Sequence, residues 1–232
     1  MKRFYREAVA VASDGGFAVR LDGRPLLTPA KNALTVPSRA LAEAVAAEWQ
    51  GQGATVNPLA LPLTRLVSTA IDRVAPRRAT IIAEIAKYAA TDLLCYRVPE
   101  PPELVARQHA TWQPLLDWAQ ERFAARLVAT QSITPVAQAD DSLAAIEQAV
   151  ASQGAMELVA LHLATAACGS VVLGLALLEG ELSPEAAFGA AQLDESFQIE
   201  RWGEDWEQTR RRAALQEDIA LAARFVGLLR AD

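Results

Sequence analysis

The residues of this sequence that could carry out acid–base, metal or thiol chemistry are few and lie far apart. Two histidines, His109 and His162, and two cysteines, Cys95 and Cys168, occur among 232 residues. Neither histidine has metal-ligand spacing to another histidine, a cysteine or a carboxylate, since Glu157 and His162 are five residues apart and point to different faces of a helix. We therefore predict no metal site, with one histidine partly exposed and the other in the core.

The thiols and glycines do not indicate catalysis either. Cys95 and Cys168 lie far apart in apolar, helix-like surroundings, which predicts no disulfide, a reducing compartment and an inert packing role for Cys168. Gly169 and Gly174 follow no strand, so they match neither a P-loop nor a dinucleotide-binding fingerprint. We interpret them as positions inside a helix where another helix approaches closely. The sequence predicts no catalytic residue and no cofactor.

The segment with the most ionisable and aromatic groups is residues 193–207, LDESFQIERWGEDWE. Arg201 is its one basic residue, so its net charge is −5. Its six carboxylate residues are Asp194, Glu195, Glu200, Glu204, Asp205 and Glu207. Trp202 and Trp206 are interleaved with these acids. Paired carboxylates suit acid–base or metal chemistry, but Asp194 and Glu195 are adjacent and diverge on a helix.

Three interpretations of this segment stay open. It is a solvated helix face beside an ordinary core stripe, or a patch that binds a partner protein. In the second case tryptophan anchors the interface, and the carboxylates set its orientation and association rate. In that case the protein either binds one specific subunit or is a scaffold for some other complex. The third interpretation is a carboxylate-dependent enzyme centred on Asp194, Glu195 and Glu200, which requires these groups to share a concave pocket.

The elements that position these groups are predicted to be mostly helices. Alanine is abundant, and hydrophobic residues make up 52% of the chain against 22% charged residues, which is typical of a helix-rich globular protein. The net charge of −6 lacks the basic footprint of a nucleic-acid binder, so we predict no nucleic-acid partner. Residues 1–57 carry a net charge of +2 and residues 58–232 one of −8, and this change supports two domains.

The predicted fold class is α+β, with a small N-terminal β-rich α+β domain, residues 1–57, followed by a larger all-helical domain, residues 58–232. Alternating apolar residues and turn dipeptides predict strands at 4–11, 17–21, 24–28 and 34–36. Ser38 is predicted to cap a helix that buries Trp49 in the core. Helical spacing and start signals predict further helices at 63–74, 77–90, 103–124, 140–152, 156–179, 184–201 and 205–229.

One apolar stretch is long enough to span a bilayer. Residues 158–178 contain no charge over 21 positions. Polar residues interrupt the stretch, glutamates lie at both its ends, and it has no basic flank. A buried core helix, hydrophobic on all sides, is therefore favoured over a membrane span, and we predict no membrane insertion.

Seven segments together resemble a known family. In chain order they are KRFY at 2–5, GGFAVRLDGRPLLTPAKN at 15–32, LAEAVAAEWQGQG at 41–53, PLTRLVSTAIDRV at 62–74, YAATDLLCYR at 88–97, QPLLDWAQERF at 113–123 and LDESFQIERWGED at 193–205. In type and order they resemble the assembly chaperones of ATP synthase that bind the free alpha subunit of its soluble catalytic head, the ATP12 chaperone family. None is a generic motif, and the resemblance covers nearly the whole chain.

The resemblance implies a chaperone that is not an enzyme and does not need ATP. It would shield the nucleotide-domain surface of an unassembled alpha subunit until the beta subunit takes its place, and we expect it to be monomeric when free. The residues implied for partner binding are Asp194, Glu195, Gln198, Glu200, Arg201 and Trp202, with the first two foremost. The N-terminal residues do not resemble the leader of the mitochondrial relatives, which favours a bacterial, cytoplasmic protein, and a mature chain whose targeting segment has been removed would look the same.

Overall fold

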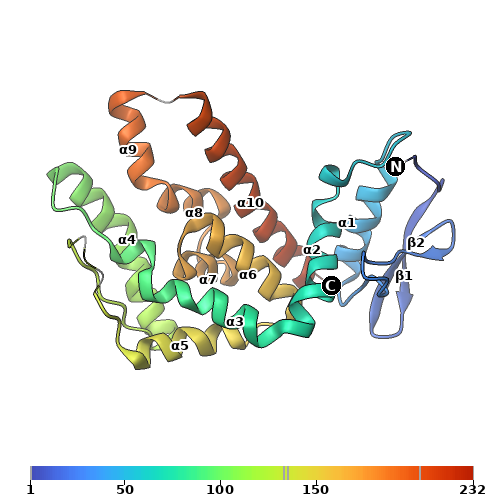
Figure 1. The fold of residues 1–232 in the computed structure, drawn as a ribbon, viewed down its shortest axis with the longest axis horizontal. Helices are drawn as coiled ribbons and strands as arrows, with labels where there is room; N and C mark the ends of the chain where they lie inside the picture. Colours follow the sequence, from blue (N-terminus) through green and yellow to red (C-terminus); the bar gives the residue numbers. More distant parts are fainter. Residues whose placement is uncertain (1, 133, 135, 204, 232) are drawn as a thin grey trace. The chain divides into compact units, whose positions relative to one another are not determined.

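The computed structural model describes residues 2–132, 134, 136–203 and 205–231. The chain forms two compact units, each assembled from segments that are distant in the sequence. Unit 1 contains residues 1–78, 155–160 and 224–232, and unit 2 contains residues 79–154 and 161–223. Figure 1 follows the chain from the strands through α1 to α10, which confirms the predicted α+β class. The predicted domain boundary at 57/58 stays a prediction, since compact units do not reveal which segments fold independently.

The sheet of unit 1 is antiparallel, with β2 (Gly16–Leu21) between the other strands. β1 (Ala8–Ser13) pairs along the whole of β2. Two short strands, β3 (Arg24–Pro25) and β4 (Thr35–Val36), pair with opposite ends of β2. The strands were predicted in this order, but β3 is shorter than expected, although the backbone N–H of Leu26 after it still donates to the carbonyl of Val19 on β2 at 2.8 Å.

The first strand begins at Ala8 and not at Phe4, as the alternation predicted. The backbone N–H groups of Arg6 and Glu7 donate to the carboxylate of Asp22, at 3.0 and 2.9 Å, in place of a strand partner. Asp22 reaches them because it occupies a tight turn with a positive φ of 48°. Its carboxylate therefore decides where strand pairing starts.

The helix α1 (Arg39–Gln50) starts where predicted, because Ser38 Oγ accepts a hydrogen bond from the backbone N–H of Leu41 at 3.3 Å. The same hydroxyl lies within hydrogen-bond distance of two carbonyl oxygens near the end of the chain, 2.6 Å from that of Leu228 and 2.9 Å from that of Ala231. The last turn of the chain is thus tied to the start of α1 within unit 1.

The start of α2 (Pro62–Thr69) is determined by a carboxylate on α1. Glu48 accepts hydrogen bonds from the backbone N–H groups of Leu63 and Thr64 at 2.6 and 2.9 Å. These N–H groups lie in the first helical turn and have no intrahelical partner, and a negative charge is favourable there. The indole N–H of Trp49 donates to Thr64 Oγ1 at 3.1 Å, and Trp49 is 9% exposed, so its predicted core position is confirmed.

The rest of the chain is largely helical. Short helical turns lie at Pro58–Ala60, Ala70–Val74, Ala75–Arg77, Lys87–Thr91 and Leu93–Cys95. The longer helices are α3 (Arg78–Ala86), α4 (Pro102–Phe123), α5 (Asp140–Ala151), α6 (Ala155–Cys168), α7 (Val171–Glu179), α8 (Pro184–Ala191), α9 (Leu193–Trp202) and α10 (Trp206–Arg230). The helix predicted at 184–201 is two helices, because Gln192 leaves helical geometry with φ −112° and ψ 25°. Within the described ranges, no helix is both long and apolar enough to cross a membrane.

The single helix predicted over residues 156–179 is wrong, because the chain breaks at Gly169 and Ser170. Gly169 ends α6 with a φ of 65°, and Ser170 Oγ caps α7 by accepting from the N–H of Leu173 at 3.0 Å. Gly174 keeps its predicted role, since a Cβ there would lie 2.6 Å from Thr165 Oγ1 on α6. Residues 171–178 are all buried, which confirms a core position for this part of the apolar stretch.

Asp92 holds the start of α7 from inside the core of unit 2. Its side chain is fully buried, and its carboxylate accepts hydrogen bonds from the backbone N–H groups of Leu94 and Val172 at 3.1 and 3.2 Å. Burial raises the pKa of Asp92 to about 6, although these hydrogen bonds and one from Ser170 favour the ionised carboxylate. Backbone N–H groups in the first turn of α7 donate hydrogen bonds that offset the free-energy cost of burying this carboxylate.

Cys168 is buried as predicted, whereas the prediction that one histidine is buried in the core is wrong. Cys168 is buried, and burial, with a smaller contribution from the nearby Asp92 carboxylate, raises the pKa of its thiol to about 12. Both His109 and His162 are exposed, so the expected core histidine is wrong. His162 lies on the solvent side of α6, with its Nε2 4.0 Å from a carboxylate oxygen of Glu84. Among the described residues, no cluster of three or more histidine, cysteine or acidic side chains could hold a metal ion.

We predict that the Asp92 carboxyl titrates near pH 6 in the folded protein, against its ordinary pKa of 3.8. Between these values the folded state keeps a proton that the unfolded chain has released. The contribution of Asp92 to the free energy of unfolding therefore falls by ~3 kcal/mol as the pH rises from about 4 to about 6. A carbon-13 NMR titration measures the midpoint, with Asp92→Asn identifying the signal. A midpoint below pH 4 would mean that the hydrogen bonds from the N–H groups lower the pKa of Asp92 by more than burial raises it.

Candidate functional site

The six residues predicted to bind a partner all lie on α9, in unit 2. Leu193 and Phe197 form the buried side of this helix, and α4 packs against it. The six residues nevertheless have three different environments. Asp194 is anchored below the surface, Glu200 and Arg201 are engaged in ion pairs, and the other three are exposed.

Asp194 connects α9 to α4. Its carboxylate accepts a hydrogen bond from Gln108 Nε2 at 2.8 Å, and the fully buried Gln108 accepts one from the backbone N–H of Val98 at 2.9 Å. Burial raises the pKa of Asp194; the Gln108 bond opposes this rise and the neighbouring Glu195 charge adds to it. A half-buried carboxylate with a buried amide partner is part of the packing between these helices.

Glu200 and Arg201 belong to a four-residue charge network with α4. Glu200 Oε2 lies 2.8 Å from Arg107 Nη1, Arg201 Nη2 lies 2.8 Å from Glu103 Oε2, and Arg107 pairs with Glu103 at 3.0 Å. Both guanidinium groups also cover the ring of Phe197, at 5.2 Å for Arg107 and 4.2 Å for Arg201. The sequence analysis missed Glu103 and Arg107, although their i, i+4 spacing signals a helix-surface pair.

Two tryptophans are exposed on either side of the connection between α9 and α10. Trp202 is 76% exposed at the end of α9, and Trp206 is 69% exposed at the start of α10. We call these two residues the exposed tryptophan pair. Glu195 and Gln198 are also exposed and line a small hollow of about 80 Å³ beside α10. Asp205 caps α10 by accepting from the N–H of Gln208 at 2.8 Å, while Glu204 lies outside the described residues.

The carboxylates proposed for an enzyme do not converge. Asp194 faces Gln108 on α4, Glu200 pairs with Arg107, and Glu195 alone lines the small hollow. A shared concave pocket was the requirement of that interpretation, and the described residues do not form one around these groups. Carboxylates that do not share a pocket are better suited to contact with another protein than to acid–base catalysis.

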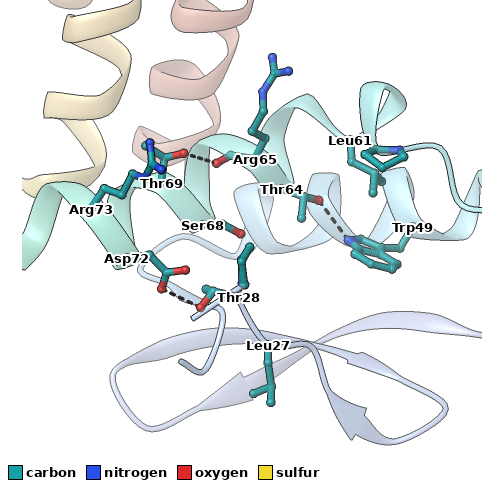
Figure 2. Close-up of a pocket in the computed structure, with 12 residues that line it drawn as sticks. Leu27, Thr28, Trp49, Leu61, Thr64, Arg65, Ser68, Thr69, Asp72 and Arg73 are labelled. Carbon is teal, nitrogen blue, oxygen red and sulfur yellow. Dashed lines mark hydrogen bonds between the residues drawn. The ribbon is translucent and has the colours of Figure 1, made fainter. Parts of the chain in front are cut away.

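A larger cavity lies in unit 1, and none of the residues that the sequence analysis singled out for binding lines it. It measures about 530 Å³ and lies between the loop of Leu27, Thr28 and Pro29 and the helical residues 64–73 (Figure 2). Trp49 and Leu61 line one end of it. Arg65 and Arg73 line the helical side and are exposed.

The loop that forms one wall of this cavity is held by Asp72. The carboxylate accepts hydrogen bonds from Thr28 Oγ1 at 2.7 Å, from Asn32 Nδ2 at 2.8 Å and from the backbone N–H of Ala30 at 3.0 Å. Desolvation by itself would raise the pKa of Asp72, but these bonds, from Asn32 first, outweigh it and lower the pKa below its ordinary value. These hydrogen bonds therefore hold the loop, and with it one wall of the cavity, in place.

Comparisons with known proteins agree with one another, over different shares of the chain. A family model described as ATP12 chaperone protein matches residues 2–120. The chain is 26% identical over 214 residues to the mitochondrial protein atp12 of Schizosaccharomyces pombe, covering 87% of this chain and 74% of that protein. The crystal structure of Atp12 from Paracoccus denitrificans is 39% identical with a TM-score of 0.95, covering 99% of this chain and 98% of that one. The Atu1473 protein from Agrobacterium tumefaciens is 41% identical with a TM-score of 0.93, covering 99% and 86% of the two chains.

We predict that the adjacent residues Asp194 and Glu195 differ in their effect on stability. Asp194→Ala leaves the buried amide of Gln108 without its partner and lowers the free energy of unfolding by about 1–2 kcal/mol. Glu195→Ala removes an exposed carboxylate and changes it by less than about 0.5 kcal/mol. Urea denaturation of the two variants measures the difference, with the unaltered chain as reference. Equal effects would show that the bond between Asp194 and Gln108 contributes nothing to the fold.

Proposed function

Because the chain belongs to the ATP12 chaperone family, we propose that it binds the unassembled alpha subunit of the soluble head of ATP synthase. In this proposal it prevents the alpha subunit from aggregating and releases it for assembly with the beta subunit. It does so as a binding protein in the cytoplasm, without hydrolysing ATP and without a cofactor. The free chaperone is a monomer, and its partner is a protein and not a nucleic acid or a membrane.

The observation that carries this proposal for the site is the exposed tryptophan pair. Tryptophan is the largest apolar side chain, and a soluble protein gains nothing by presenting two of them, 76% and 69% exposed, to water. At interfaces tryptophan is among the residues that contribute most to binding, usually inside a polar rim. Glu195, Asp205 and Glu207 are exposed carboxylates in the same part of the sequence, and we propose that they supply such a rim.

The six proposed contact residues take different parts in this surface. Trp202, Glu195 and Gln198 are exposed and are proposed to touch the alpha subunit directly. Glu200 and Arg201 stay proposed contacts, but they would have to bind through, or exchange, their ion pairs with α4. Asp194 is proposed to act mainly by holding α9 in place, since its carboxylate is engaged with Gln108.

The function is tested with purified alpha subunit, whose aggregation on dilution from denaturant is followed by light scattering. We expect the chain to suppress scattering at a stoichiometric ratio, equally with and without ATP. Size-exclusion chromatography should then yield a complex of one chain and one alpha subunit. Identical scattering in the presence and absence of the chain would refute the proposal, and the beta subunit serves as the client control.

The binding surface is tested with Trp202→Ala combined with Trp206→Ala. Because tryptophan anchors commonly contribute about 2 kcal/mol or more, we expect the affinity for the alpha subunit to fall at least ~30-fold. The melting temperature should stay unchanged, because neither ring is buried. Isothermal titration calorimetry measures the affinity.

The matched control for the tryptophan variant is Phe4→Ala combined with Leu59→Ala, which removes two apolar side chains that are 64% and 81% exposed in unit 1. This control should bind like the unaltered chain. If the control and the tryptophan variant lose the same affinity, binding depends on general surface hydrophobicity and not on the exposed tryptophan pair.

A further inference from the structure

The cavity of unit 1 carries two positive charges that the fold does not use. Arg65 and Arg73 are exposed, and within the described part of the chain neither guanidinium has a hydrogen-bond or ion-pair partner. The acid that lines the same cavity, Asp72, already accepts three hydrogen bonds from the loop opposite. The two arginines are therefore available to a carboxylate that comes from another molecule.

The side of the cavity across from the helical residues 64–73 is apolar and partly open. Figure 2 shows Leu27 on the side of the cavity opposite the helical residues 64–73, with Trp49 and Leu61 at one end. Leu27 is 48% exposed, although leucine side chains are most often buried. The cavity thus has an apolar side that is partly exposed to solvent and a helical side that carries the two arginines.

The dimensions of the cavity fit an extended polypeptide. Its volume of about 530 Å³ lies within the range of roughly 300–1,000 Å³ that is typical of ligand sites. Arg65 and Arg73 are eight residues apart on a helical segment, which corresponds to about 12 Å along its axis. In an extended chain, residues i and i+4 are separated by about 13 Å and point to the same side as residue i+2.

We propose that this cavity binds a short extended segment of a polypeptide in which an apolar side chain lies between two acidic residues, each two positions away. The acidic side chains pair with Arg65 and Arg73, and the apolar side chain contacts Leu27 and Trp49. A single compact anion would reach one guanidinium and leave the apolar wall uncovered, whereas this segment satisfies both. The site is formed by residues of unit 1 and shares none with the exposed tryptophan pair, and it does not depend on the alpha subunit being the partner.

The proposal is tested by NMR with the peptide acetyl-Asp-Thr-Leu-Thr-Asp-amide and the full, isotopically labelled chain. The indole N–H signal of Trp49 and the backbone amides of Thr64 and Ser68 should shift and saturate, with a Kd of about 1 mM or lower. Asparagine in place of both aspartates, or alanine in place of the leucine, should weaken binding about tenfold. Added salt should also weaken it, because the charge pairs are exposed.

The protein variant that tests the site is Arg65→Glu combined with Arg73→Glu, for which we expect at least about tenfold weaker binding of the same peptide. Arg20→Glu combined with Arg24→Glu makes the same change of charge in unit 1 outside the cavity and should bind normally. The NMR spectrum of each variant shows directly whether it is folded.

Three results would overturn the proposal. The first is no shift of the cavity signals at millimolar peptide. The second is equal binding of the asparagine peptide, which would remove the role of the arginines. The third is an equal response to sodium acetate, which would make the cavity a small-anion site. None of these results bears on binding of the alpha subunit, which is measured separately with the tryptophan variant.

Discussion

The core of unit 2 depends on one carboxylate that has no contact with solvent. Asp92 needs N–H donors in order to remain buried, and the first turn of α7 provides them, so the position of Asp92 and the start of α7 determine each other. Because α7 is buried along residues 171–178, α4 and α8 pack against a helix whose start Asp92 holds. The break at Gly169 and Ser170 makes these donors available, since a continuous helix would leave no free N–H groups for Asp92.

Unit 1 uses carboxylates in the same way, at the ends of its elements. Asp22 decides where strand pairing starts, Glu48 caps α2, and Asp72 holds the loop beside the cavity. Each accepts at least one backbone N–H that would otherwise lack a partner. Other acids stay exposed at many places along the chain, among them Glu195 on α9 and Asp205 and Glu207 at the start of α10. The fold thus uses some carboxylates at the ends of its elements and leaves others in contact with solvent.

Local signals in the sequence predicted most of the elements, and long-range contacts account for several of the failures. Ser38 and Ser183 are followed by helices because a capping hydroxyl acts within three residues. The break at Gly169 and Ser170 has a local stop and cap signal too, but it was missed because the apolar run around it was interpreted as one buried helix. The pattern around residues 193–207 predicted a patch of acids, but the engagement of Asp194, Glu200 and Arg201 by α4 depends on residues that are far away in the sequence. Arg65 and Arg73 looked like ordinary helix-surface charges, and only the folded loop of Leu27 gives them a cavity.

The hydrogen bonds of Ser38 near the end of the chain have a consequence for synthesis. Unit 1 includes residues 1–78, but also residues 155–160 and 224–232, and the carbonyl groups of Leu228 and Ala231 meet Ser38 at the start of α1. Domains generally fold as they emerge from the ribosome, beginning with the N-terminal one. Here the sheet and α1 emerge first, yet their partners are translated last. A protein proposed to protect an unassembled subunit therefore passes through a vulnerable interval of its own, whose length is set by the time needed to translate the helices in between.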